Sequence, residues 1–500
     1  MKFEPLYYEG RLRVVNPEGD VGVVTLWSKV DSAIQVMLEA GVDLCEQTSR
    51  VAIVANLYGN GLQQMLRNLL WNPQIQHILI LGKNLSGSQE SLVNFFAYGL
   101  EEVEFLGAKA FQIRNTTRKI DGELQADRFK SVPKFSVLGD LGSSETKDGL
   151  VKYFQNLLTR FQGEMVRIEP PPIPEPVITR FPSEVRSQTI VRRTPMEAWS
   201  ELIFRLYRFG HRNKVTKRTG EETRIELLNT HVVVEEPFEE TEKCLSEYGF
   251  SLEKFREYQD RFLDSQKPSD LDYTYGNRLR GHFHRGDVIV DSPLIVADRL
   301  RESPDSRHCY IALWDNRLDL PEGTKCPCFV SAFFRHFDGK LNLTANFRTH
   351  NAMDAWPENL YGLMALQRFV AGHASMQVGP ITVISHSISI DPIALEKAKG
   401  VVENKKTDEV MDPSIGKYGP RMDPNGEFTV TLDTISFEIV VEHSYGGMKI
   451  GEYRGKTSEE IERQLARDVA LSQISHALYL GRELARKQIQ LDAIRAKKLL

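Results

Sequence analysis

The sequence of 500 residues has few cysteines and no strong excess of charge. Five cysteines are too few for a disulfide framework, and the odd number favours reduced thiols, as in a cytosolic protein. A formal net charge of -5 excludes a global basic field that would hold a nucleic-acid backbone. No apolar run approaches the roughly 20 residues that span a bilayer, and Met1–Pro5 lacks the apolar core of a secretion signal. These absences predict a soluble, cytoplasmic protein without nucleic-acid or membrane partners.

The composition is that of an ordinary globular protein, with 41% hydrophobic and 26% charged residues. A chain of this length usually forms two or three domains. The clearest boundary is the proline-rich stretch 169–176, because proline removes backbone donors and favours an extended spacer. We therefore predict a domain over 1–165, a linker over 166–190, a second domain over 191–400 and a third over 401–500.

The first segment alternates between strand and helix patterns. Short runs rich in valine and isoleucine at 51–56 and 77–81 are typical of buried strands. Between them, apolar residues from Leu62 to Leu70 recur at helical spacing, and a further helix is expected after Gly87. This order predicts a parallel α/β layer domain.

The remaining segments favour a mixed architecture. From about 227 to 391, short strands alternate with helices in an α+β pattern. Residues 428–441 are typical of paired strands, and Thr457 with Glu460 forms a capping box that would open one long helix reaching past residue 484. The predicted fold class is α/β and α+β multidomain, ending in strands plus a long helix.

One cysteine and three arginines of the second domain are candidates for a shared site. Most free cysteines are small buried hydrophobes, and a reactive one needs cationic neighbours that stabilise its thiolate. Arginines that bind a phosphate monoester would supply this charge. Cys328 is the candidate nucleophile, and Arg218, Arg307 and Arg348 are the candidate phosphate ligands. Taken singly, each arginine would be interpreted as a solvated surface charge.

Six ordered motifs between residues 195 and 391 resemble thymidylate synthase, and most of all its archaeal branch. The motifs are Lys217–Gly220, Tyr273–Arg280, Ser303–His308 with Trp314–Asn316, Cys326–Cys328, Asp338–Leu341, and Arg348–Asn351 with Pro357–Asn359. This resemblance implies a thymidylate-synthase-like α+β catalytic domain.

The resemblance implies transfer of a one-carbon unit to C5 of 2'-deoxyuridylate. Cys328 would add to C6 of the uracil, and C5 would then take a methylene group from 5,10-methylenetetrahydrofolate or a related reduced pterin. Hydride return would give thymidylate. Asn359 would recognise the uracil edge, because an amide can donate to O4 and accept from N3–H, whereas a carboxylate would favour cytosine. Glu257 would manage the proton, and Tyr275 would line the substrate site.

The resemblance also implies a phosphate site that two subunits share. Arg218, Arg348 and the Thr349 hydroxyl would hold the phosphate, and Arg307 would enter from a second subunit, which predicts a homodimer. His308 stands where the family has a second phosphate-binding arginine, and histidine carries a charge only when protonated.

Two further contacts depart from the family pattern. Asn351 replaces the aspartate that holds the pterin ring, so the identity of the one-carbon carrier is open. The family's His-x-Tyr pair for the sugar hydroxyl corresponds to Ser389 and Asp391 without a gap, or to His386 and Ile388 with one. These departures leave two alternatives: a pyrimidine-nucleotide hydroxymethylase, in which water intercepts the methylene intermediate, or a non-catalytic nucleotide-binding or assembly protein.

The flanking domains show separate resemblances. Stretches between 59 and 88 resemble the corrinoid-carrying subunit of tetrahydromethanopterin methyltransferase, which has a cobalt-binding histidine after the glycine equivalent to Gly87. Ser88 stands there, so we expect no bound corrinoid. The last domain resembles an uncharacterised domain found beside such synthase-like domains. We expect its His443 and His476 to be satisfied by hydrogen bonds, and we predict no metal, since two histidines are too few for zinc.

Overall fold

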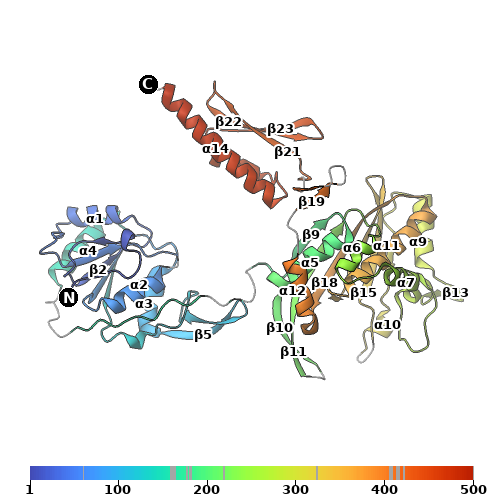
Figure 1. Cartoon of the computed structure of the whole chain (residues 1–500), viewed down its shortest axis with the longest axis horizontal. Helices are drawn as coiled ribbons and strands as arrows, with labels where there is room; N and C mark the ends of the chain where they lie inside the picture. The colour runs from blue at the N-terminus through green and yellow to red at the C-terminus, as the bar shows by residue number, and fades with distance from the viewer. Residues whose placement is uncertain are drawn as a thin grey trace. The chain divides into compact units, whose positions relative to one another are not determined.

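The computed structural model describes all residues except 60, 158–164, 176–177, 179–182, 218–219, 322–324, 405–408, 413–416, 421–422 and 499–500. The chain divides into two compact units, Met1–Lys399 and Gly400–Leu500 (Figure 1). Among the residues described, no helix has both the length and the apolar character needed to cross a membrane.

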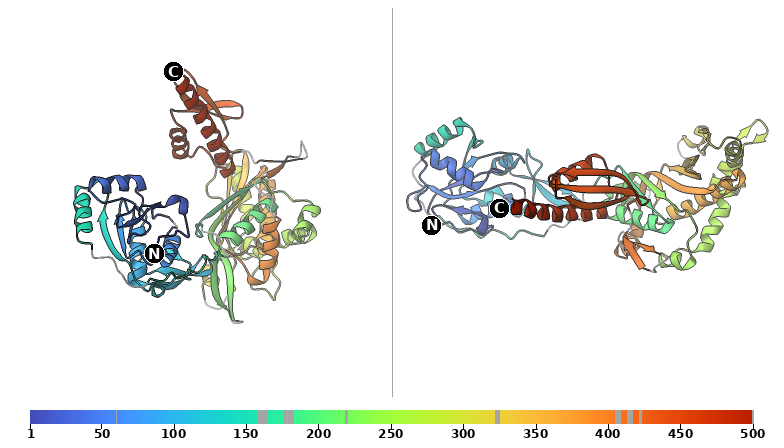
Figure 2. Two further views of the ribbon diagram at one scale, coloured as in Figure 1. Left: turned by 60° about the vertical axis from the view of Figure 1, so that its left-hand side comes forward. Right: turned by 90° about the horizontal axis from the view of Figure 1, so that it is seen from above.

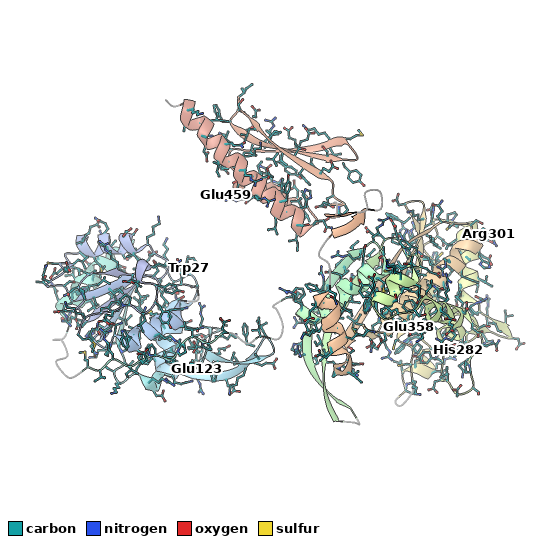
Figure 3. All side chains as sticks on the ribbon, viewed as in Figure 1. Trp27, Glu123, His282, Arg301, Glu358 and Glu459 are labelled. Atoms are coloured by element: carbon teal, nitrogen blue, oxygen red, sulfur yellow. The ribbon has the colours of Figure 1, made fainter. Side chains whose placement is uncertain are left out.

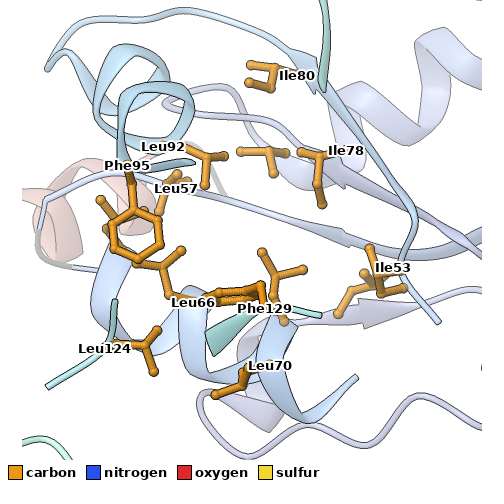
Figure 4. Packing of buried hydrophobic residues seen from close by; sticks show 14 of the residues in the cluster. Ile53, Leu57, Leu66, Leu70, Ile78, Ile80, Leu92, Phe95, Leu124 and Phe129 are labelled. Carbon is orange, nitrogen blue, oxygen red and sulfur yellow. The ribbon is translucent and has the colours of Figure 1, made fainter. Parts of the chain in front are cut away.

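The first part of the chain is a parallel α/β layer domain, as the sequence predicts. Its elements are β1 (Arg13–Val14), β2 (Val21–Val24), α1 (Val30–Glu39), β3 (Val51–Ala55), α2 (Leu62–Trp71), β4 (His77–Leu81), α3 (Ser88–Tyr98), β5 (Leu100–Phe105), β6 (Ala108–Ile113), β7 (Lys119–Ile120), β8 (Lys134–Gly139) and α4 (Ser144–Gln155). The main sheet has the order β1-β3-β2-β4-β8, with β1 antiparallel and the others parallel. Helices α1 and α4 cover one face, and α2 and α3 cover the other (Figure 1). Leu66, Leu92 and Phe95 pack in the α2/α3 layer (Figure 4).

The central part of the chain is an α+β domain built on one mixed sheet. Its strands are β9 (Gln188–Arg192), β10 (His211–Lys217), β11 (Gly220–Val234), β12 (His284–Arg285), β13 (Val288–Ile289), β14 (Tyr310–Ala312), β15 (Phe329–Phe337), β16 (Lys340–Phe347), β17 (His350–Asn351) and β18 (Val378–Ile390). Its helices are α5 (Pro195–Phe209), α6 (Glu242–Glu247), α7 (Leu252–Leu263), α8 (Tyr275–Arg280), α9 (Ser292–Glu302), α10 (Asn316–Asp319), α11 (Ala355–Ala374) and α12 (Leu395–Glu403). The sheet order is β10-β11-β18-β16-β15-β14, with β9 beside β11 and β17 beside β18. Buried and half-buried residues alternate along β16 and β18, so one face of the sheet is covered and the other is partly open.

Short local signals fix the elements around the site. Thr194 and Glu197 form a capping box at the start of α5, with proline in its first turn. Asp338 (φ 51°) and Gly339 (φ 72°) make the two-residue turn between β15 and β16. Helix α11 has 14 of its 20 residues buried, so the side chains near its start, including Asn359, are held in the core.

The C-terminal unit packs a long helix on three antiparallel strands, which both views of Figure 2 show. Its elements are β19 (Glu409–Asp412), β20 (Lys417–Pro420), β21 (Glu427–Asp433), β22 (Glu438–Tyr445), β23 (Met448–Gly455), α13 (Ser458–Arg467) and α14 (Ile474–Lys498). The expectation of one helix from Thr457 past residue 484 is wrong, because the helix ends at Arg467 and Val469 adopts a left-handed φ of 49°. Asp423 then holds the turn before the second helix, accepting from Ser472 N (3.1 Å) and Gln473 N (3.2 Å).

Candidate active site

Cys328 lies just before β15, in a loop that Arg348 holds. Arg348 N donates to Cys328 O (2.9 Å), Arg348 Nε to Pro327 O (3.0 Å) and Arg348 Nη2 to Cys326 O (3.1 Å). Trp314 Nε1 also donates to Pro327 O (3.0 Å). The candidate nucleophile and one candidate phosphate ligand are therefore in direct contact through the backbone of the Cys326–Cys328 loop.

The Cys328 thiol is half-buried and tends to keep its proton. Burial raises the pKa of the Cys328 thiol, and the positive charge of Arg348 opposes this rise without cancelling it. The thiol is therefore predominantly neutral at pH 7 in the ligand-free protein. Its reaction with a pyrimidine would require removal of a proton.

Three tyrosines surround Cys328. Tyr273 and Tyr275 hydrogen-bond to the backbone of Cys328 and Phe329. Burial raises the pKa of Tyr273 to about 12, and it raises those of Tyr258 and Tyr275 still further above the ordinary value. All three are neutral phenols that can donate hydrogen bonds.

The same tyrosines line a cleft of about 550 Å³. Arg261 and Lys325 contribute positive charge to its wall, and Lys325 lies 3.8 Å from the Asp272 carboxylate. The cleft gives a flat aromatic ligand three aromatic rings to contact.

Asn359 belongs to a buried chain of hydrogen bonds. It is 4% exposed, and its Oδ1 accepts from the Tyr258 hydroxyl (2.5 Å). Asn359 Nδ2 lies 2.9 Å from His350 Nε2, and His350 Nδ1 lies 2.8 Å from Ser385 Oγ. Burial lowers the pKa of His350 to about 3, so this imidazole is neutral. Sequence reasoning missed Tyr258, His350 and Ser385.

Glu257 is not brought to this chain of hydrogen bonds. Its side chain is exposed on α7, while the next residue, Tyr258, points into the site, as adjacent helical residues point in different directions. The carboxylate whose negative charge helps to raise the pKa of Tyr258 is instead that of Glu358, which precedes Asn359 in the sequence. Figure 3 labels Glu358 in the central domain. Burial raises the pKa of Glu358, and Arg261 opposes that rise.

The remaining candidate phosphate ligands fall into two groups. Arg218 lies outside the described residues, so its role stays a prediction. Arg307 and His308 are exposed, in a loop that Arg299 ties down by donating to His308 O. Arg335 of β15 also ties this loop, by donating to two of its backbone carbonyls. Within one chain these two side chains face solvent.

The candidate folate and sugar contacts lie around the start of α11. Asn351 Oδ1 accepts from Met353 N (2.9 Å) and from the next backbone N–H, and Asn351 Nδ2 donates to Asp391 Oδ2 (3.3 Å). Ser389 pairs with Asn351 across β17 and β18. His386 is exposed and lies 3.1 Å from Asn229 Oδ1. Of the two alignments, the structure brings Ser389 and Asp391 beside Asn351.

Thr349 is half-buried next to Arg348, where its hydroxyl could bind the same anion as the arginine.

Among the described residues, no group of three or more His, Cys, Asp or Glu side chains could hold a metal ion. Ser88, at the position of the expected cobalt ligand, is 3% exposed and its Oγ lies 3.0 Å from Ser86 Oγ. The expectation that no corrinoid binds stays a prediction.

Comparison with known proteins places these features in context. A family model described as thymidylate synthase matches residues 236–411, and one described as PterinBD-DUF4346 matches residues 422–496. The chain is 32% identical over 182 residues to a protein of Methanosarcina acetivorans named "putative thymidylate synthase". The aligned residues are 36% of this chain and 80% of the relative. A protein of the same name from Methanothermobacter marburgensis is 30% identical over 221 residues, which are 42% of this chain and 95% of the relative.

Proposed function

The chain belongs to the thymidylate synthase family, and from this we propose that its central domain transfers a one-carbon unit from a reduced pterin to C5 of 2'-deoxyuridylate. The observation that supports the proposal most is the contact between Arg348 and the Cys326–Cys328 loop. An arginine there can bind the nucleotide's phosphate while its charge favours the Cys328 thiolate.

The reaction begins with attack of the Cys328 sulfur on C6 of the uracil, which leaves C5 as the nucleophile. The thiol must first lose its proton, because burial raises the pKa of Cys328. We assign this proton to Glu358 in place of Glu257, since the pKa of Glu358 is raised by burial and its charge acts on Tyr258. C5 then bonds to the methylene carbon and loses its own proton, and the bond from that carbon to the pterin nitrogen breaks. The exocyclic methylene carbon takes a hydride from the reduced pterin and becomes the methyl group. The Cys328 sulfur leaves C6, which gives thymidylate and the dihydropterin.

The cleft lined by Tyr258, Tyr273 and Tyr275 fits the reduced pterin in size and in stacking surface. Asn351 replaces the family's aspartate, and its amide oxygen already accepts from the backbone N–H groups of Met353 and Asp354 before α11. The tyrosines would therefore contribute more of the pterin contact than in the family pattern. 5,10-methylenetetrahydrofolate is the carrier to test first.

A homodimer is part of the proposal. Tyr310 and Phe333 are each 47% exposed on β14 and β15, and their rings lie 4.7 Å apart. Arg335, on the same side of β15 as Phe333, ties the Arg307 loop to this exposed face. A second subunit that covers the face would meet Arg307 directly. Size-exclusion chromatography with light scattering tests this, and Phe333→Arg should give a monomer.

Release of tritium from [5-³H]-2'-deoxyuridylate tests the activity. The full chain with methylenetetrahydrofolate should release tritium and form thymidylate, and Cys328→Ala should lose this activity completely. Cys326→Ala is the matched control, two residues away in the same loop, and should keep most of it. A hydroxymethyl product would favour the hydroxymethylase instead. No release from the native chain would favour a nucleotide-binding protein without turnover.

A covalent adduct gives a second readout for the nucleophile. The native chain should form a stable adduct with 5-fluoro-2'-deoxyuridylate and the reduced folate, visible as a mass increase of the intact protein. Cys328→Ser should form none. An adduct on a different residue would contradict the assignment of Cys328.

A further inference from the structure

The Asn359 amide has four hydrogen-bonding positions: two N–H groups and two oxygen lone pairs. Tyr258 uses one lone pair and His350 uses one N–H. One N–H and one lone pair remain for a ligand. The rotation of the amide decides whether the oxygen or the nitrogen faces Tyr258. It therefore also decides where a pyrimidine edge would find the free N–H donor and where it would find the free lone pair.

The two distances indicate the rotation. A separation of 2.5 Å from Tyr258 suits O–H···O, whereas N–H groups normally stand nearer 2.9 Å from their acceptors. The separation of 2.9 Å from His350 Nε2 suits an amide N–H as donor. The amide oxygen therefore faces Tyr258 and the amide nitrogen faces His350.

His350 is built to be an acceptor at Nε2. It is 3% exposed and neutral, and its ring stacks on Phe347 at 3.9 Å with an interplanar angle of 25°, which prevents rotation. Asn359 Nδ2 can only donate, so His350 Nε2 accepts and the imidazole proton lies on Nδ1, with Ser385 Oγ at 2.8 Å as its acceptor. Ser385 is itself 1% exposed, so water does not compete for this bond.

We propose that Tyr258 and His350 are positioning residues that lock the Asn359 amide in the rotation that accepts uracil and rejects cytosine. Uracil needs an N–H opposite O4 and an oxygen opposite N3–H. Cytosine has the reversed pattern, a 4-amino donor beside an N3 acceptor, and would require the amide to turn over. Turning over would require the Tyr258 hydroxyl to accept instead of donate. It would also require the His350 proton to move from Nδ1 to Nε2, with Ser385 donating to Nδ1, so all three partners would have to change together. This inference rests on the proposed function, because it assumes that Asn359 contacts the base.

The test compares the affinities of the full chain for 2'-deoxyuridylate and 2'-deoxycytidylate, measured by calorimetry. The native chain should favour the uracil nucleotide. Tyr258→Phe and His350→Phe each delete one partner while keeping a ring in place, and each should lower the preference roughly tenfold, the effect of about one hydrogen bond. The double variant should lower it further.

Two controls separate this effect from loss of fold. Glu257→Gln changes the exposed neighbour of Tyr258 and should keep the native preference. 2-Deoxyribose 5-phosphate has no base, so its affinity should be the same for native and variant chains. If His350→Phe proves unstable, Tyr258→Phe alone carries the test, since Tyr258 lines the open cleft.

The outcomes separate the two hypotheses. A native chain that prefers uracil, with variants that retain the preference in full, overturns the lock and leaves the proposed function standing. A native chain that binds neither nucleotide overturns both. A native chain that binds both nucleotides equally overturns the lock, because an amide held in one rotation cannot serve both edges.

Discussion

His350 of the central domain and His476 of the C-terminal unit are both held by a hydrogen bond at Nδ1, yet their partners differ in charge. His350 bonds to the neutral Ser385, and burial lowers the pKa of His350 to about 3. His476 lies 3.1 Å from the Asp423 carboxylate. Burial raises the pKa of Asp423, but hydrogen bonds from Ser472, the Asn425 backbone and His476 outweigh it and bring the pKa to about 2.

Because one histidine has a neutral partner and the other has a carboxylate, the two regions should lose stability in different pH ranges. His350 binds a proton less readily when folded, so acid favours the unfolded state already below the ordinary histidine pKa of about 6.5. The ionised Asp423 carboxylate stabilises the folded C-terminal unit, and this stabilisation is lost only when the carboxylate is protonated, below about pH 4. The central domain should therefore weaken on acidification before the C-terminal unit does.

The largest expected effect is the acid sensitivity of the central domain. Between pH 6.5 and 3, unfolded His350 is protonated and folded His350 is not, so stability falls as pH falls, by about 1.4 kcal/mol per pH unit. Over the whole range this is on the order of 5 kcal/mol. Hydrogen exchange of central-domain peptides, followed by mass spectrometry, measures it.

Replacing His350 should remove that slope. His350→Phe should make the stability of the central domain nearly independent of pH between 6.5 and 4, as measured by exchange protection corrected for the intrinsic exchange rate. His386→Asn, which replaces an exposed histidine of β18, should leave the slope in place. An unchanged slope in His350→Phe would show that another group causes the acid sensitivity.

The second effect is the loss of the Asp423 carboxylate. Asp423→Asn should destabilise the C-terminal unit by about 2 kcal/mol at pH 7, because the folded pKa lies below the unfolded one and the carboxylate stabilises only above that range. The variant should also lose the stability change between pH 4 and 2. Asp468→Asn, which removes an exposed charge paired with Arg467, is the control and should change stability much less than Asp423→Asn.

The smallest expected effect is the loss of the N-cap of α13, which contrasts an uncharged cap with the charged Asp423 in the same unit. Thr457→Ala removes the acceptor for Glu460 N (3.2 Å) at the start of α13 and should cost about 1 kcal/mol at every pH, since no charge is lost. Urea unfolding of the C-terminal unit measures it, and Thr457→Ser should be nearly neutral. A cost that changes with pH would mean that the cap is coupled to the Asp423 network.

His443, the other histidine of the C-terminal unit, behaves as the sequence suggests. Its Nε2 lies 2.7 Å from Asn425 O, and its ring stacks on Phe428 at 4.2 Å. His476 lies against the same Phe428 ring, at 5.5 Å. The two histidines thus come close, and each has a hydrogen bond that accounts for its position.

Features encoded by neighbouring residues could be predicted from the sequence. The buried strands near 51–56 and 77–81, the cap at Thr194 and the turn at Asp338 each follow from a few consecutive side chains. The contact between Cys328 and Arg348 could be anticipated as well, because both belong to motifs with a recognisable order.

Features that need distant residues could not be predicted. The turn between α13 and α14 is held by Asp423, which lies 50 residues before Gln473 in the sequence. His350 and Ser385 are 35 residues apart, and Tyr258 and Asn359 are 101 apart. The role of Glu257 stays a prediction, and the exposure of its side chain beside the half-buried Tyr258 depends on how α7 packs on α11, which the local sequence does not reveal.

Arg348 spends guanidinium N–H groups on the carbonyls of Cys326 and Pro327 before any ligand arrives. These bonds hold the guanidinium in one orientation before an anion binds. Binding of the anion would therefore require little rearrangement of Arg348. Lysine, with one compact ammonium instead of a planar fork, would hold the two carbonyls in a less fixed geometry and would direct its remaining N–H less precisely.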